Sequence, residues 1–216
     1  TRIGRFLLDL YLGDKPPEQG VQGRLGEQPS LAVPAQETLV TSRADALLTD
    51  EERRFIADFL GGGTLLGQGQ TSALRVQLSD EDIRKIAALV RAEAGDEPFE
   101  GMVAVAEVVL NRLESRWFPN TVEEVIRQPG QFEPVMSGKY DEILQSQKDL
   151  TKELEAVRVA LEGSEFAKGA LFFFNPTIVT LRNPEHWMLN PELFLTYADI
   201  GHHRFGTEIR GGKPLG

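Results

Sequence analysis

One carboxylate, Glu93, interrupts the apolar face of the helix that the surrounding sequence predicts. With about 100° per residue and Ile83 placed at zero, Glu93 falls at about 280°, between Ile86 and Leu89. Burial disfavours the charged form of a carboxyl group, so this position predicts a raised pKa for Glu93. A carboxyl that keeps its proton near neutral pH can act as a general acid. The wheel alone favours a simpler alternative, in which Glu93 reaches water from the last helical turn.

The other polar groups near Glu93 offer less chemistry. Asp96, Glu97 and Glu100 are expected to be cap and surface groups rather than a second catalytic acid. The chain has no cysteine, which excludes thiol nucleophiles, disulfides and thiolate metal ligands. Three histidines, two of them adjacent, predict no metal site. The sequence contains no nucleotide-binding loop, so no cofactor is predicted.

The composition is that of a globular protein. A chain of 216 residues can form one domain with a proper core, or one domain plus a tail. The net charge of -10 argues against a nucleic-acid partner, whose binding surface would be basic. No run of 18 apolar residues occurs, so no membrane-spanning helix is predicted. No secretory signal is recognisable at the start, which leaves the compartment open.

Capping residues mark the starts of two helices. Thr49 with Glu52 predicts a helix from about 50 to 60, which ends at three consecutive glycines. A second capping box predicts a helix from about 80 to 94, closed by Gly95 as its C-terminal cap.

The next segment predicts the central helix of the fold. It follows Pro98, which suits the first turn of a helix, and reads FEGMVAVAEVVLNRLES. The segment is apolar almost all round, because only Glu107, Asn111 and Glu114 form a polar stripe. A helix of this kind should be surrounded by other elements.

Shorter elements complete the chain. TVEEVIRQPGQF predicts a capped short helix and a Pro-Gly turn, and residues 141 to 162 predict one or two surface helices ending at Gly163. The aromatic run in GALFFFNPTIVT, broken by Asn-Pro, predicts a strand or an extended segment, and LTYADIGHHRF is a further short apolar stretch. The predicted fold class is α+β, predominantly helical, with a small β element.

The domain organisation is predicted from composition. Residues 1 to 45 are rich in Gly, Pro, Gln and Ser and could not fill a core, and residues 61 to 77 resemble a second linker. We therefore expect a flexible arm with one short helix over residues 1 to 77, with room for a protein partner. Residues 78 to 210 are expected to form the organised domain.

Beyond periodicity, the segment AEAGDEPFEGMVAVAEVVLNRLESRWFPNTVEEVI resembles the SleB/CwlJ-type cell wall hydrolase family. The later segments QPGQFEPVMSG, GALFFFNPTIV and IGHHRF are similar to that family's motifs in the same order, so the resemblance covers roughly residues 80 to 206. It implies a lysozyme-like helical fold, location in the cell envelope, and cleavage of peptidoglycan glycan strands, typically as a lytic transglycosylase. It also implies that Glu93 is the catalytic acid, which reverses the interpretation from the wheel.

The expected substrate-binding residues carry less specific signals. Gln131 and Phe132 could bind a sugar by a hydrogen bond and by stacking, or could simply cap and pack. Asn175 precedes a proline, which is common in turns, and the resemblance moves it toward the groove. Trp187 could stack on a sugar or pack in the core, and His203 is the histidine that matches the family.

Two features keep other functions open. The family usually places Arg where this chain has Gly95, and residues 1 to 75 show no paired repeats of a peptidoglycan-binding module. A muramidase that uses water would need a second carboxylate, for which Glu100, Glu133 and Asp141 are candidates. The third alternative is a catalytically weak wall-binding or assembly protein of a phage-like or secretion apparatus.

Overall fold

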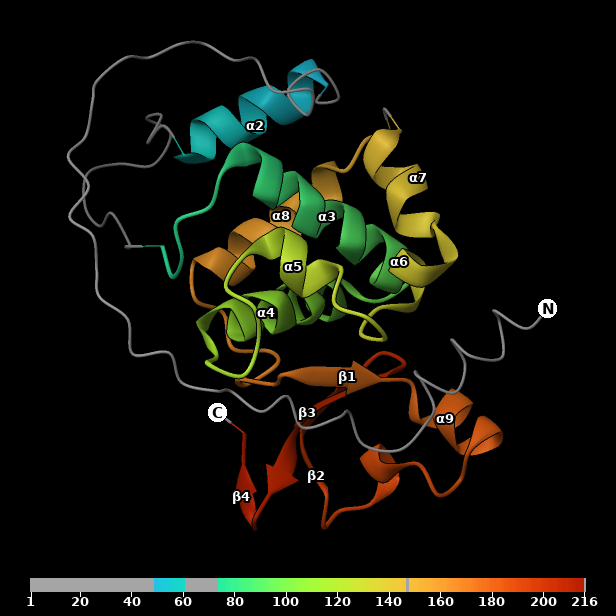
Figure 1. Ribbon diagram of the computed structural model, residues 1–216. Coiled ribbons are helices and arrows are strands. Elements are labelled where there is room, and N and C mark those ends of the chain that lie inside the picture. Colours follow the sequence, from blue (N-terminus) through green and yellow to red (C-terminus); the bar gives the residue numbers. More distant parts are fainter. Residues whose placement is uncertain (1–48, 61–73, 147, 216) are drawn as a thin grey trace.

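The computed structural model describes residues 49–60, 74–146 and 148–215. These residues form a helical part that lies beside a small antiparallel sheet (Figure 1), which confirms the predicted α+β class. The helices are α2 (Asp50–Leu60), α3 (Asp80–Ala94), α4 (Phe99–Glu114), α5 (Val122–Ile126), α6 (Glu133–Ser137), α7 (Lys139–Gln145), α8 (Thr151–Leu161), α9 (Pro176–Arg182) and the 3-10 helix η2 (Trp187–Leu189). The strands are β1 (Phe172–Phe174), β2 (Phe194–Ile200), β3 (His203–Arg210) and β4 (Lys213–Pro214).

The first two described helices have the predicted bounds because their capping boxes form. In α2, the Glu52 backbone N–H donates to Thr49 Oγ1 at 3.1 Å, and the Thr49 backbone N–H donates to Glu52 Oε2 at 2.8 Å. In α3, the Asp82 backbone N–H donates to Ser79 Oγ at 3.1 Å. Each cap satisfies a backbone donor that the helix itself leaves open and stabilises the helix by about 1 kcal/mol.

The central position of α4 is confirmed. It packs against α3 and α8, and every residue from Gly101 to Arg112 is buried. The buried part of its polar stripe is satisfied inside the protein, since Glu107 accepts hydrogen bonds from Ser164 Oγ at 2.6 Å and from the Ala167 backbone N–H at 2.6 Å. Buried Asn111 donates through Nδ2 to the Ala170 carbonyl at 2.7 Å, which gives it a structural role.

The prediction of surface helices between residues 141 and 162 is wrong for α8. Leu154, Val157 and Ala160 are fully buried, and α8 packs against both α3 and α4. Charged residues on the opposite side of α8 dilute its apolar stripe in the sequence, so the segment looks solvated. The short helices α6 and α9 were not predicted, because five and seven residues give too little periodicity to detect.

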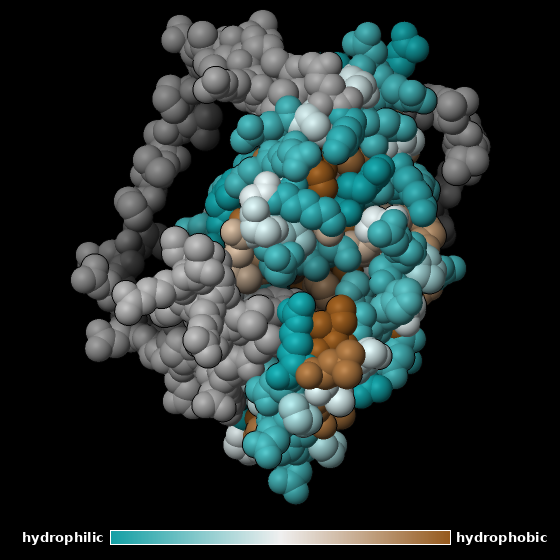
Figure 2. Space-filling model, turned by 90° about the vertical axis from the view of Figure 1, so that its right-hand side faces the viewer, coloured by the Kyte–Doolittle hydropathy of each residue, from teal (hydrophilic) through white to brown (hydrophobic). Residues whose placement is uncertain are grey.

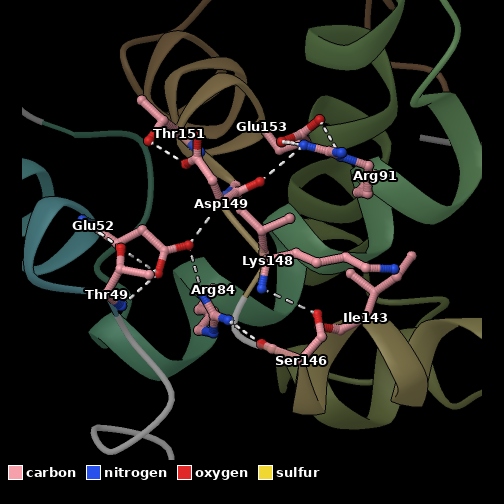
Figure 3. Close-up of polar contacts among 11 residues, drawn as sticks. Thr49, Glu52, Arg84, Arg91, Ile143, Ser146, Lys148, Asp149, Thr151 and Glu153 are labelled. Carbon is pink, nitrogen blue, oxygen red and sulfur yellow. Dashed lines mark hydrogen bonds and ion pairs between the residues drawn. The ribbon is translucent and has the colours of Figure 1, made fainter.

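The described part of the predicted arm is attached to the organised domain (Figure 3). Glu52 of α2 is fully buried, and its Oε1 accepts hydrogen bonds from Arg84 Nη1 at 2.6 Å and from the Leu150 backbone N–H at 3.2 Å. Arg84 lies on α3 and is also buried. The expected tether over residues 1 to 45 lies outside the described residues, as do residues 61–73 of the expected linker.

The described end of that expected linker is packed rather than extended into solvent. Leu74 and Val76 pack against the core, and the Arg75 backbone N–H donates to the Leu161 carbonyl at 3.0 Å. The side chain of Arg75 also pairs with Glu114 on α4. The packed structure therefore begins before residue 78 on this side of α3.

The final segments form a sheet with the strand order β1-β3-β2, and β4 pairs with the outer end of β3. The apolar stretch predicted near the end of the chain is the β2–β3 hairpin, in which Ile200 faces His203. A bulge between Thr196 and Ala198 shifts the register of β2. A second apolar cluster lies on this sheet and contains Leu171, Phe172, Phe174, Val179, Trp187, Phe194 and Leu215.

One face of the protein carries an apolar patch among polar residues (Figure 2). This face includes α9, on which Ile178 and Leu181 are exposed. Among the described residues, no helix has the length and apolar character needed to cross a membrane.

Candidate active site

Glu93 lies one residue before the end of α3, on the side that packs against the rest of the domain. Ile86 and Leu89, its predicted neighbours on the helical wheel, are fully buried. The Glu93 side chain is half-buried as a whole, but its Oε1 atom is buried and has no hydrogen-bond partner. A buried oxygen in this state faces no protein donor that would favour the carboxylate form.

The pKa of Glu93 is accordingly raised from its usual 4.5 to about 8. Burial is the largest cause, and the negative charge of Glu133 acts in the same direction. The positive charges of Lys139 and Arg112 lower the pKa and oppose these two effects. Glu93 is therefore largely protonated at neutral pH, as the sequence predicted, with a pKa close enough to neutrality for the group to release and recover a proton.

The end of α3 is held by contacts of the two residues that precede Glu93. Arg91 pairs with buried Glu153 of α8 through Nε at 2.6 Å (Figure 3), and its Nη2 donates to the Asp149 carbonyl at 3.0 Å. Lys139 Nζ donates to the Ala92 carbonyl at 2.9 Å. These contacts fix the last turn of the helix and thus the direction in which Glu93 points.

Arg112, near the end of α4, brings a buried positive charge to the site. Its Nε donates to the Leu171 carbonyl at 2.7 Å, which orients the guanidinium. The guanidinium carbon lies 4.9 Å from the ring centres of Phe118 and Phe132 and 5.4 Å from that of Phe172. Ring faces attract cations, so these three rings stabilise the charge away from water.

Glu133 and Lys139 bring the other two charges, from α6 and α7. Gly138 separates these helices with a φ of +85°, a left-handed conformation that glycine adopts without strain. Both side chains are exposed, and both helices lie against α3. Glu93 is therefore influenced by one exposed anion, one exposed cation and one buried cation.

An aromatic wall connects Arg112 to the sheet. Phe132 is buried, and its ring centre lies 6.2 Å from that of Phe173 on β1. The ring of His203 on β3 meets Phe173 edge-on at 5.1 Å. Burial lowers the pKa of His203 while Glu97 raises it less, so the imidazole is neutral at neutral pH.

The structure distributes the remaining predicted site residues over packing and capping positions. Gln131 is half-buried beside Phe132. Phe132 and Trp187 are 1% and 8% exposed, so the packing role that the sequence left open fits both better than sugar stacking. Asn175 caps α9, since its Oδ1 accepts from the Ile178 backbone N–H at 3.1 Å. Among the described residues, no group of three or more potential ligands could hold a metal ion.

Known proteins resemble this chain over the region that follows α3. The sequence model of a family described as Cell Wall Hydrolase matches residues 96–206, more than half of the chain. The chain belongs to the cell wall hydrolase family. Glu93 lies three residues before the matched region, on the helix that leads into it.

Individual relatives of this family are similar over part of their length. The spore cortex-lytic enzyme of Bacillus subtilis (strain 168) is 43% identical over 102 residues, which are 47% of this chain and 32% of the relative. That of Oceanobacillus iheyensis is 44% identical over 102 residues, 47% of this chain and 35% of the relative. The chain thus spans about a third of the length of these relatives.

A solved structure is also similar to this chain. The crystal structure of the catalytic domain of the Bacillus cereus SleB protein is 34% identical and superposes with a TM-score of 0.53. The superposition covers 65% of this chain and 100% of that domain. The resemblance that the sequence motifs indicated is therefore confirmed at the level of family and fold.

Gly95, where family members usually have Arg, ends α3 as predicted, but in a right-handed conformation with a φ of -58°. Gly95 therefore does not adopt the left-handed conformation of a C-terminal glycine cap. A Cβ at this position would lie 2.7 Å from the Arg91 carbonyl oxygen, too close without a shift of the backbone. The site has no cation at position 95, and the cations that act on Glu93 are Arg112 and Lys139.

Proposed function

We propose that this protein cleaves the glycan strands of peptidoglycan between N-acetylmuramic acid and N-acetylglucosamine, as a lytic transglycosylase with Glu93 as its acid and then its base. The observation that carries the proposal is the state of Glu93: a carboxyl group with a raised pKa and a buried oxygen that has no hydrogen-bond partner. Membership of the cell wall hydrolase family supports the substrate class. The names of the relatives support a place in the cell envelope, as in a spore.

One carboxyl group suffices for this reaction. Protonated Glu93 donates its proton to the bridging oxygen as the bond to the anomeric carbon breaks, which leaves an oxocarbenium-like sugar. The Glu93 carboxylate then removes the proton from the 6-hydroxyl of the same muramic acid, and that oxygen attacks the anomeric carbon. The products are a 1,6-anhydro sugar and a free 4-hydroxyl, Glu93 is protonated again, and no water is consumed.

The surroundings of Glu93 suit both halves of this cycle. Burial and Glu133 keep the proton on Glu93 before the bond breaks. Arg112 and Lys139 stabilise the carboxylate that remains after the proton leaves. A group with a pKa of about 8 can therefore serve as an acid and then as a base without a large energetic cost in either direction.

The second candidate function is a muramidase that uses water. Glu133 fits the role of its second carboxylate better than Glu100 or Asp141 does. Among Glu100, Glu133 and Asp141, only the charge of Glu133 raises the pKa of Glu93. Asp141 is engaged with Arg127 at 2.6 Å. In that reaction Glu133 would activate the attacking water, and the products would carry reducing ends.

Fewer residues are proposed to contact the sugar than the sequence suggested. Gln131, Asn175 and His203 are half-buried, and we propose that they contact the sugar. Phe132 belongs to the aromatic wall and packs against Arg112, whereas Trp187 packs against Phe172 in the second apolar cluster, and we propose that neither ring contacts the sugar directly. We also propose that the N-terminal arm, residues 1 to 77, binds a protein partner.

Digestion of purified peptidoglycan, followed by mass spectrometry of the released fragments, tests the function. We expect anhydro-muropeptides from the wild type. Glu93→Gln should lose activity by at least about 1,000-fold while staying folded, because the near-isosteric amide cannot donate the required proton. Glu133→Gln should retain anhydro products, and Glu100→Gln, an exposed substitution on α4, is the matched control.

Each alternative has a distinct outcome. Reducing-end fragments that disappear in Glu133→Gln would establish the muramidase instead. A folded wild type that releases no fragments would favour the wall-binding protein. Glu93→Gln with wild-type turnover would refute the assignment of the acid.

A further inference from the structure

Two turns that are far apart in the sequence meet beside the end of α3. Glu97 lies in the turn between α3 and α4, and its side chain is 9% exposed. Its Oε2 accepts a hydrogen bond from the His202 backbone N–H at 2.9 Å, and its Oε1 lies 3.0 Å from His202 Nδ1. One carboxylate thus contacts both the backbone and the side chain of the turn that joins β2 to β3.

The β2–β3 turn is shaped around this carboxylate. Gly201 has a φ of +57°, which glycine adopts without strain. A Cβ at this position would lie 1.9 Å from Glu97 Oε2 and 2.8 Å from Pro98 Cδ. A side chain at residue 201 would therefore displace the carboxylate, so the close approach of the two turns depends on glycine here.

The same hairpin carries part of the proposed substrate-binding wall. His203 is the first residue of β3, and its Nδ1 lies 3.9 Å from Glu97 Oε1. Its ring contacts Phe173, and Phe173 in turn packs against Phe132. A displacement of the β2–β3 turn would therefore move the wall relative to α3, which carries Glu93.

From these contacts we propose that Glu97 is a positioning residue, whose carboxylate fixes the β2–β3 turn, and with it His203, at a set distance from Glu93. The inference rests on the proposed function, because it gives Glu93 and His203 their roles in the groove. Glu97 acts through geometry, since its charge is not among those that act on Glu93. A misplacement of about 1 Å in a catalytic site can reduce the rate about 100-fold.

The fold should survive the loss of this contact. Ile200, which ends β2, packs against the main core, and the β2–β3 ladder has its own backbone pairing. The hairpin would then remain folded and paired with β1, while its turn would no longer be held at residue 97. This separates a positioning role from a purely structural one.

Two conservative variants separate the effect of side-chain length at residue 97 from the effect of its charge. Glu97→Asp keeps the charge but shortens the side chain by about 1.5 Å, so it should lose the contact with the His202 backbone. Glu97→Gln loses the charge but keeps the length, so its oxygen can still accept that hydrogen bond. We expect kcat/KM on peptidoglycan to fall about 10- to 100-fold in Glu97→Asp and to stay within about threefold of the wild type in Glu97→Gln. Asp96→Ala, which removes the adjacent exposed carboxylate, is the matched control.

Amide hydrogen exchange at His202 provides a readout that is independent of catalysis. It should accelerate in Glu97→Asp and stay slow in Glu97→Gln, because only the longer side chain accepts from this N–H. Fast exchange with full activity in Glu97→Asp would overturn the inference. Equal losses of activity in the two variants would also overturn it, because reach would then not be the property that matters.

The Glu93→Gln variant, assayed in parallel, separates this inference from the proposed function. An inactive Glu93→Gln together with a fully active, folded Glu97→Asp would reject only the positioning role. Wild-type activity in Glu93→Gln would reject the proposed acid, and the positioning role would fall with it.

Discussion

Replacing Glu93 by Gln should make the protein more stable as well as inactive, and the gain should depend on pH. The folded protein holds the Glu93 proton with a pKa of about 8, whereas the unfolded chain releases it near the usual 4.5. Between these two pH values the unfolded state binds fewer protons than the folded state, so the free energy of unfolding of the wild type falls as pH rises. The amide that Glu93→Gln introduces does not titrate, so the variant is spared this loss.

The size of the effect follows from the shift. Each pKa unit corresponds to about 1.4 kcal/mol of free energy of unfolding. Glu93→Gln can therefore exceed the wild type in stability by at most about 2 kcal/mol at about pH 6. Above pH 8 this limit is about 5 kcal/mol. The Glu93 side chain is only half-buried as a whole, and water at its exposed part will reduce these values. We expect about half of the limit, roughly 2 kcal/mol at alkaline pH.

Urea denaturation of the full chain at a series of pH values from about 5 to about 9 measures this difference. Glu100→Gln controls for the loss of one carboxylate at an exposed position on the neighbouring helix. The stability difference between Glu93→Gln and the wild type should grow with pH, whereas that of Glu100→Gln should not. Parallel pH curves for Glu93→Gln and the wild type would refute the raised pKa and, with it, the argument for a stored proton.

Two further predictions concern the charges around α3. Glu52→Gln should lower the free energy of unfolding by about 3 kcal/mol in urea denaturation, because it leaves the buried Arg84 guanidinium without its ion-pair partner, while Glu51→Gln on the exposed side of α2 should have little effect. A small loss in Glu52→Gln would mean that Arg84 is compensated elsewhere. Lys139→Met should raise the pKa of Glu93, since the positive charge of Lys139 lowers that pKa. The alkaline limb of the pH–rate profile should therefore move to higher pH. A shift in the opposite direction would contradict this electrostatic account.

Short-range patterns in the sequence predicted the helix that carries Glu93. The bounds of α3 depend on Ser79 and Asp82, three residues apart, and the inward direction of Glu93 depends on helical periodicity alone. The central position of α4 followed from its apolar composition. These are local properties, and each of them could be worked out without knowing where the chain returns.

The surroundings of Glu93 could not be predicted in this way. Arg112 and Lys139 influence it only because α4 and α7 come back to the same end of α3, and no local pattern specifies that return. Glu97 looked like a surface group, yet its partner His202 lies 105 residues further along the chain. The burial of Trp187 could not be predicted either, because a sequence does not distinguish an aromatic residue that binds sugar from one that fills a core.

The buried pair of Glu52 and Arg84 has a practical consequence for anyone who shortens this protein. The match to the family begins at residue 96, and a fragment cut there would lack Glu93 altogether. A fragment cut at residue 78 would retain Glu93 but would separate Arg84 from Glu52. The shortest useful expression fragment should therefore begin at or before Thr49, ahead of the boundaries suggested by similarity and by composition.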